Sequence, residues 1–339
     1  MTPYKGIKMF DFYGETTTLK LINMDDVEVE SVSWLLYPFI PYGKITIVQG
    51  DPGEGKTTLL IQIIARLTRG LNVFDMDEDE DYVFESNKPQ NVIYQTAEDG
   101  LGDTIKPRLL AADADCKYVH VIDESEMPLT MLDARLEAAI IRTKARLVVL
   151  DPIQGYIGAD VDMHKANEIR PVMKRLSVIA QKYNCAIVLI GHMNKNSSGK
   201  SSYRGLGSID ISAAARSVLL VGRIKDKPQM RVVCHVKSSL APEGRSLCFE
   251  LDKDNGFIWR GQCDITADEL LSGPKTNFKI TDAKAFLLEI LSKNPTAQSI
   301  IDAEARLKGI KEKTLRNAKK ELNVKSMKSG DQWYWMLPD

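Results

Sequence analysis

The hydrophobic positions of the first 200 residues fall into short unbroken runs that alternate with amphipathic stretches. Runs of branched apolar residues without polar alternation are typical of parallel strands buried on both faces. They lie at Lys44–Gln49, Asn91–Gln95, Arg146–Leu150 and Cys185–Ile190, with a further strand expected over Lys117–Ile122. Helical periodicity lies between them, at Lys56–Arg69, Leu132–Lys144 and Asn167–Tyr183. The pattern predicts an α/β fold with a mostly parallel central sheet.

After Ser217 the pattern changes to apolar runs separated by short turns. The runs SVLLVGRI, QMRVVCHVKS, RSLCFELD and GFIWR follow one another without helices between them. Such spacing is typical of hairpins, so we expect antiparallel strands that extend the parallel sheet.

The last 60 residues form a separate pattern of three amphipathic helices and a terminal hairpin. We expect helices at Thr281–Lys293, Ala297–Leu307 and Lys311–Leu322, followed by a hairpin over Val324–Leu337. This order predicts a winged helix-turn-helix, in which Trp333 and Trp335 pack rather than stack on bases. The expected organisation is a lead-in over 1–30, an α/β domain over 31–264, a linker over 265–280 and the winged-helix domain over 281–339.

Composition supports an ordinary globular protein. The chain has 339 residues, 44% hydrophobic and 27% charged, and no apolar run of the 18 to 20 residues or so that a membrane helix needs. The N-terminus lacks the pattern of a signal peptide, so we expect a cytoplasmic protein without a membrane partner. Five cysteines without a C-x-x-C pair predict free thiols and no zinc site.

Charge is unevenly distributed. Residues 275–339 contain 13 Lys and Arg against 8 Asp and Glu, a net charge of +5, within a chain of net charge −1. A basic tail on an acidic body favours a polyanionic partner for the tail. A solvated charged surface is the alternative.

The segment GDPGEGKT matches G-x-x-x-x-G-K-[ST] between a predicted strand and a predicted helix. Glycines in this setting turn backbone N–H groups toward phosphates, and the helix N-terminus adds a positive dipole end. The lysine, Lys56, neutralises the β- and γ-phosphates. The motif predicts ATP binding by Gly50, Asp51, Pro52, Gly53, Glu54, Gly55, Lys56, Thr57 and Thr58.

Three polar residues follow the other predicted strands. Asp151 ends a buried strand, where its carboxylate can hold Mg²⁺ together with the Thr57 hydroxyl, although Asp is also a common helix cap. Glu98 follows the strand NVIYQ and is the expected general base beside the phosphates, with Asp99 as the alternative. His192 follows a fourth strand and is expected to respond to the γ-phosphate.

These motifs also carry a resemblance. Over roughly Trp34 to Trp259, the chain resembles the RecA-like ATPases related to plasmid RepA hexameric helicases. Its motifs occur in the same order as in those proteins: Trp34, IPYGK, GDPGEGKTT, QTAED, LVVLDPIQGYIG, GHMNK and YRGLGSIDISAAARSVL. The resemblance implies a ring, usually of six subunits, with ATP between neighbours and single-stranded DNA through the centre. It implies that a loop with Lys195, Lys200 and Arg204 contacts that DNA.

A ring ATPase also takes a basic residue from the neighbouring subunit to stabilise the transferring phosphoryl group. Related helicases often have Lys-x-Arg on a late strand, whereas this chain has Lys237-Ser238-Ser239. The candidates for this role are therefore Arg204, Arg216 and Lys237, and a structural ion pair is the alternative for Arg216.

The tail resembles the winged helices at the C-terminus of phage and mobile-element ATPases. Its third helix has basic residues near one face, which is expected to bind duplex DNA, with protein docking as the alternative. These residues are Lys311, Lys313, Arg316, Lys319 and Lys320.

Together these features predict a DNA-dependent ATPase that uses ATP and Mg²⁺. The favoured hypothesis is a ring-forming replicative DNA helicase of a phage or plasmid-like element. An ATP-switched DNA-binding regulator or helicase loader, and a RecA-type recombinase, are the alternatives.

Overall fold

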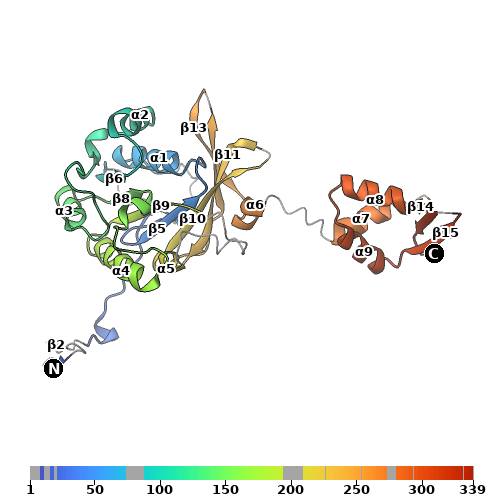
Figure 1. Cartoon of the computed structure of the whole chain (residues 1–339), viewed down its shortest axis with the longest axis horizontal. Coiled ribbons are helices and arrows are strands. Elements are labelled where there is room, and N and C mark those ends of the chain that lie inside the picture. The colour runs from blue at the N-terminus through green and yellow to red at the C-terminus, as the bar shows by residue number, and fades with distance from the viewer. Residues whose placement is uncertain are drawn as a thin grey trace. The chain divides into compact units, whose positions relative to one another are not determined.

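The computed structural model divides the chain into two compact units (Figure 1). Unit 1 comprises Met1–Gly222 and Gln229–Asp264, and unit 2 comprises Ile265–Asp339 with Arg223–Pro228. The structure describes residues 8–10, 16–18, 21–73, 88–193, 209–225, 227–252, 254–272, 280–292, 294–330 and 332–338.

The described part of unit 1 contains a nine-stranded sheet, in the order β13-β12-β11-β10-β5-β9-β8-β6-β7. From β10 to β7 all neighbours are parallel, while β11, β12 and β13 pair antiparallel. The predicted fold class is therefore confirmed. The strands are β5 (Ile45–Gly50), β6 (Val92–Thr96), β7 (Val119–His120), β8 (Leu147–Asp151), β9 (Ala186–His192), β10 (Ser217–Ile224), β11 (Lys227–Ser238), β12 (Ser246–Asp252) and β13 (Gly256–Cys263).

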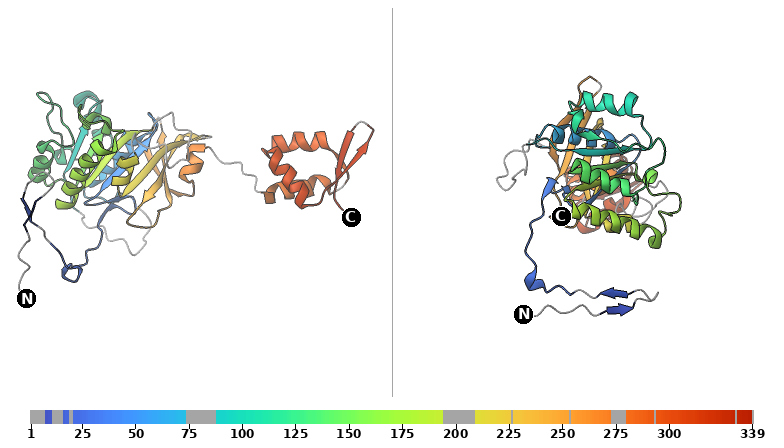
Figure 2. Two further views of the ribbon diagram at one scale, coloured as in Figure 1. Left: turned by 60° about the horizontal axis from the view of Figure 1, so that its bottom comes forward. Right: turned by 90° about the vertical axis from the view of Figure 1, so that its left-hand side faces the viewer.

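Helices cover both faces of this sheet, which explains the unbroken apolar runs (Figure 2). On β8, Leu147 and Val149 pack on the face of the first two helices, while Val148 and Leu150 pack on the opposite face. The first face holds α1 (Lys56–Thr68) and α2 (Lys106–Ala111), and the second holds α3 (Ala134–Thr143), α4 (Ala166–Lys182) and α5 (Ile209–Ala214).

Smaller elements depart from the predicted pattern. The expected strand Lys117–Ile122 shortens to β7 because a 3₁₀ turn occupies Cys116–Tyr118. The expected linker 265–280 contains α6 (Ala267–Ser272). Two short antiparallel pairs precede β5, namely β1 (Lys8–Phe10) with β2 (Thr16–Thr18), and β3 (Trp34–Leu36) with β4 (Ile40–Pro41). Within the described ranges, no helix is long and apolar enough to span a membrane.

Beyond α6, the described part of unit 2 contains three further helices and a small antiparallel sheet. The helices are α7 (Ile280–Leu291), α8 (Gln298–Leu307) and α9 (Glu312–Glu321), and the strands are β14 (Thr296–Ala297), β15 (Lys325–Ser329) and β16 (Gln332–Met336). Its core gathers Phe286, Ile301, Leu315 and Trp335 from all these layers. The pattern missed β14, because two residues are too few for a period to show; it pairs with β16 through Thr296 and Ala297.

A buried histidine on β11 makes the stability of unit 1 dependent on pH. The His235 ring stacks on Phe39 with centroids 4.6 Å apart, and the Gly244 N–H donates to its Nδ1 over 3.2 Å. His235 is only 8% exposed, and burial lowers its pKa from 6.5 to about 4. The folded state therefore holds this side chain neutral under conditions in which the unfolded chain binds a proton.

We expect the contribution of His235 to the free energy of unfolding to be complete above pH 6.5 and to decrease as the pH falls toward 4. The total loss corresponds to about 3 kcal/mol. Urea unfolding of the wild type and of His235→Asn across this range measures it, because the variant lacks the titrating group. Parallel pH curves for the two proteins would contradict the assignment.

Candidate functional site

The loop between β5 and α1 has the conformation that its glycines predict. Gly53 and Gly55 have φ angles of +77° and +88°, which side chains disfavour. A Cβ at Gly50 would lie 2.2 Å from the Val221 carbonyl oxygen, so β10 leaves no room for a side chain there. The conformation of the loop is therefore set by the positive φ angles of its glycines and by the close packing of β10 against Gly50.

Lys56, the first residue of α1, turns back over the loop. Its ammonium donates to the carbonyl oxygens of Gly50 (2.9 Å) and Asp51 (2.8 Å), and the residue is 5% exposed. Burial lowers the pKa of Lys56, and Asp151 is the strongest of the nearby carboxylates that oppose this shift. The ammonium thus lies at the centre of the loop, where bound phosphates would compensate for its burial.

Thr57 and Asp151 meet at the carboxyl ends of β5 and β8. The Thr57 hydroxyl donates to Asp151 Oδ2 over 2.7 Å, and the Tyr94 hydroxyl donates to the same oxygen over 2.9 Å. Burial raises the pKa of Tyr94 far above its ordinary value, with Asp151 adding to the effect. Tyr94 on β6 was missed by sequence reasoning, since a tyrosine inside an apolar strand gives no signal beyond core packing.

The oxygens of Thr57 and Asp151 fit a magnesium site. Mg²⁺ is usually bound by one or two protein oxygens together with substrate phosphates, rather than by a protein cage. Within the described residues, no group of three or more His, Cys, Asp and Glu is arranged so that it could hold a metal ion by itself. The hydroxyl and the carboxylate would hold the ion beside phosphates placed by Lys56, where it would neutralise phosphate charge.

We expect Tyr94→Phe to raise the Mg²⁺ concentration needed for half-maximal ATP hydrolysis by about fivefold, since one hydrogen bond to Asp151 is worth about 1 kcal/mol. The maximal rate at saturating Mg²⁺ should change little. Mg²⁺ titrations of ATP hydrolysis and of fluorescent-nucleotide binding measure the shift. Tyr42→Phe is the matched control, because Tyr42 is also buried but donates to Gln90, over 2.9 Å; an equal shift in both variants would contradict a local role.

Glu98 and His192 complete the arrangement. His192 Nδ1 lies 3.4 Å from Lys56 Nζ, and its Nε2 lies 4.0 Å from Glu98 Oε1. The Glu98 side chain is 64% exposed. Asp99 instead forms an ion pair with Arg108 at 2.9 Å. Glu98 is therefore linked to Lys56 through His192, whereas Asp99, the alternative base, is paired with Arg108.

Strand order explains how these distant residues meet. Gly50 pairs with His192 across β5 and β9, and Thr96 pairs with Asp151 across β6 and β8. All four strands are parallel, so their carboxyl ends share one edge of the sheet. Glu98 follows β6, which is separated from β5 by β9 and β8, so it is not on the strand adjacent to the phosphate loop.

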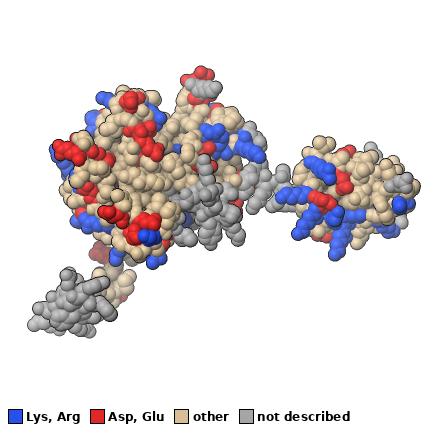
Figure 3. Space-filling model, viewed as in Figure 1, with Lys and Arg blue, Asp and Glu red and all other residues tan. Residues whose placement is uncertain are grey.

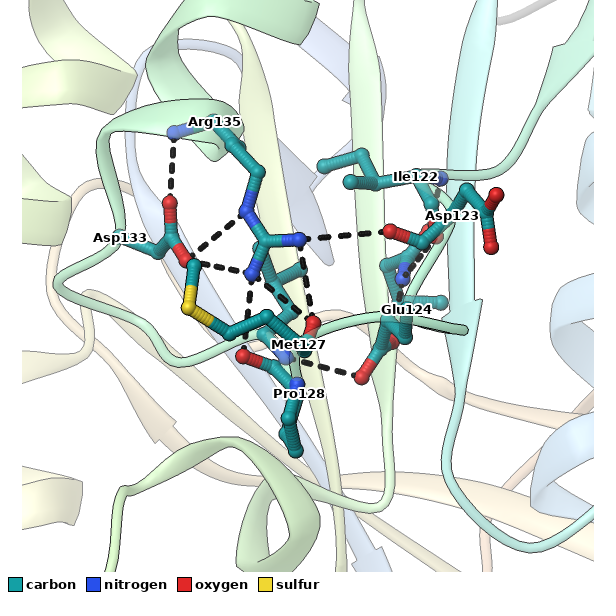
Figure 4. A network of polar contacts seen from close by, with 9 residues as sticks. Ile122, Asp123, Glu124, Met127, Pro128, Asp133 and Arg135 are labelled. Atoms are coloured by element: carbon teal, nitrogen blue, oxygen red, sulfur yellow. Dashed lines mark hydrogen bonds and ion pairs between the residues drawn. The ribbon is translucent and has the colours of Figure 1, made fainter.

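The segment after β7 packs beside this edge through a polar network (Figure 4). Gln95 of β6 donates to Ile122 O and Glu124 Oε1, and accepts from the Ile122 N–H over 2.5 Å. Arg135 donates to the carbonyl oxygens of Met127 and Pro128 and to Asp133 (Figure 4). The network fixes residues 122–135 against the strand that leads to Glu98.

Two of the three candidates for a basic residue that acts on a neighbour's nucleotide, Arg216 and Lys237, lie away from the phosphate loop. Arg216 is exposed and its N–H donates to Ile45 O, at the amino end of β5 and opposite the phosphate loop. Lys237 Nζ donates to the carbonyl oxygens of Ser212, Ala213 and Ala215, which end α5. Burial, and then Arg216, lower the pKa of Lys237. Lys195, Lys200 and Arg204 lie outside the described residues.

Comparison with known proteins gives the family of the segment that contains this site. A model of the AAA domain family (AAA_25) matches residues 15–198. DNA repair protein RadA of Listeria monocytogenes is 30% identical over 156 residues, which are 45% of this chain and 28% of RadA; the chain therefore spans less than a third of that relative. Protein RecA of Rickettsia bellii is 23% identical over 272 residues, 74% of each chain.

Among solved structures, a RadB recombinase covers 65% of this chain and 91% of its own, with 18% identity and a TM-score of 0.45. The matched residues 15–198 are more than half of the 339 and contain the phosphate loop, Glu98, Asp151 and His192. The chain belongs to the AAA domain family and has the P-loop ATPase site described above.

Proposed function

We propose that this protein is a DNA-dependent ATPase, and more closely a ring-forming replicative helicase of a phage or plasmid-like element that moves on single-stranded DNA. The observation that carries the ATPase part is the contact of Lys56, Thr57, Asp151, His192 and Glu98 at one edge of the sheet. The names of the RadA relatives, as DNA repair proteins, support the DNA part.

In this proposal each residue has a separate task. Lys56 neutralises charge on the β- and γ-phosphates, and Thr57 with Asp151 holds Mg²⁺, oriented by Tyr94. Glu98 accepts a proton from the attacking water, while His192 lies between Glu98 and Lys56 and senses the γ-phosphate. A neighbouring subunit supplies the missing cation, from Arg204, Arg216 or Lys237.

The test is the steady-state rate of ATP hydrolysis with and without single-stranded DNA, together with electron microscopy of the assembled protein. Strong stimulation by DNA and closed rings are the expected results. Filaments in place of rings would move the assignment to a recombinase, which the 23% identity to RecA over 74% of the chain favours as an alternative.

One observation favours a second candidate, an ATP-switched DNA-binding regulator or helicase loader. The Lys237 ammonium is held by three carbonyl oxygens at the end of α5, and this bonding opposes its use on another subunit's nucleotide. Slow hydrolysis that is indifferent to DNA, with DNA binding retained in Glu98→Gln, is the result that this candidate predicts.

A further inference from the structure

The hairpin of β15 and β16, here called the wing, has a tryptophan on its surface. Trp335 is 3% exposed in the core of unit 2, whereas Trp333 is 50% exposed. Residues two apart on a strand point to the same face. Trp333 therefore continues the face that packs on the helices, but half of its side chain stays exposed at the edge of that core.

Two lysines lie on the face of the wing that carries the tryptophans. Lys328 is the cross-strand partner of Trp333 on β15, and so lies on the same face of the wing. Lys319 of α9 donates to Ser326 over 2.5 Å and lies 3.9 Å from the centre of the Trp335 ring. Helix α9 and this face of the wing are therefore adjacent, with Lys319 turned toward the wing.

The exposed side of α9 continues the positive surface. Lys313, Arg316 and Lys320 recur at spacings of three and four residues and are all exposed, and Arg316 pairs with Glu312. Residues 311–328 contain seven Lys and Arg against two Glu. Figure 3 shows Lys and Arg gathered on the part of unit 2 where Figure 1 labels α9. This composition favours a polyanion as the partner.

We propose that α9 and the wing bind DNA where a single strand leaves a duplex, with Trp333 stacked on the first unpaired base. The cations would bind phosphates whatever the sequence. An indole needs an open base face, which a duplex interior does not offer but an unpaired end does. One such stack is worth about 1–3 kcal/mol. The inference rests on the proposed action on DNA and names the DNA structure that unit 2 recognises.

The test uses the full chain and two DNA hairpins, one blunt and one with a single unpaired nucleotide, in which 2-aminopurine replaces the unpaired base. One unpaired nucleotide is enough for a stack and too short to thread a ring. We expect binding to quench the 2-aminopurine, and a preference of about 5- to 150-fold for the overhang. Trp333→Ala should lose both, and Trp333→Phe should retain part of each.

Met327→Ala is the matched control, because Met327 is 47% exposed on the opposite face of the same wing and should leave both readouts unchanged. Equal preference in the wild type and Trp333→Ala, or equal loss in Met327→Ala, would overturn the inference. ATP hydrolysis stimulated by long single-stranded DNA is measured on the same proteins. If DNA stimulates hydrolysis but the protein shows no preference for the overhang, only the present inference is contradicted. If the protein prefers the overhang but DNA does not stimulate hydrolysis, only the proposed DNA-dependent ATPase activity is contradicted.

Discussion

Lys56→Ala should reduce the rate of ATP hydrolysis by at least about 10²- to 10³-fold, a loss of about 3–4 kcal/mol of transition-state stabilisation. The ammonium is held over the loop by the carbonyl oxygens of Gly50 and Asp51, at 2.9 and 2.8 Å. Alanine leaves the loop glycines in place but removes the cation that the phosphates would contact. Steady-state phosphate release measures the loss, and fluorescent-nucleotide titration measures the accompanying loss of affinity.

Lys44→Ala is the control for this variant, because Lys44 precedes the same strand at its amino end and is only partly buried. It should hydrolyse ATP at nearly the wild-type rate. Thermal unfolding of both variants distinguishes a lost contact from a lost fold. A Lys56→Ala protein that keeps more than about a tenth of the wild-type rate would contradict the assignment of this lysine to the phosphates.

Glu98→Gln should bind ATP with nearly unchanged affinity but hydrolyse it about 10²- to 10⁴-fold more slowly, because an amide cannot take a proton from water. Asp99→Asn separates the two candidate bases. Asp99 is paired with Arg108 at 2.9 Å, so its loss should cost less than about 1 kcal/mol of stability and leave the hydrolysis rate near that of the wild type. Single-turnover hydrolysis of pre-bound ATP is the measurement, and the reverse result would transfer the base to Asp99.

The strand pattern predicted the sheet because burial on both faces shows directly in composition. The unbroken runs around Val148 and Ile190 could only be interior strands, and the polar residues that follow such strands could then be placed at one edge. Asp151 was found in this way, whereas Lys56 and Thr57 were found from the motif GDPGEGKT. Register and strand order are not encoded in any single run, so the position of β9 and β8 between β5 and β6 could not be predicted from the runs.

Contacts made by ordinary core residues could not be predicted either. Tyr94 has the same pattern signal as its apolar neighbours, and only its geometry reveals the hydrogen bond to Asp151. Trp333 and Trp335 occupy equivalent positions in the alternation of β16, but only Trp335 belongs to the core of unit 2, whereas Trp333 is half exposed. In both cases the local sequence permits either a buried core side chain or one with a contact outside the core, and tertiary packing decides between them.

The position of Arg216 has a consequence for how activity depends on dilution. Its backbone is aligned with Ile45, and the phosphate loop begins five residues further along β5, roughly 16 Å away at the rise of a strand. An arginine side chain spans less than half of that distance, so no copy can place Arg216 on its own nucleotide. If this residue is the missing cation, catalysis requires two copies in contact, and the rate per molecule will fall as the protein is diluted below the dissociation constant of the assembly.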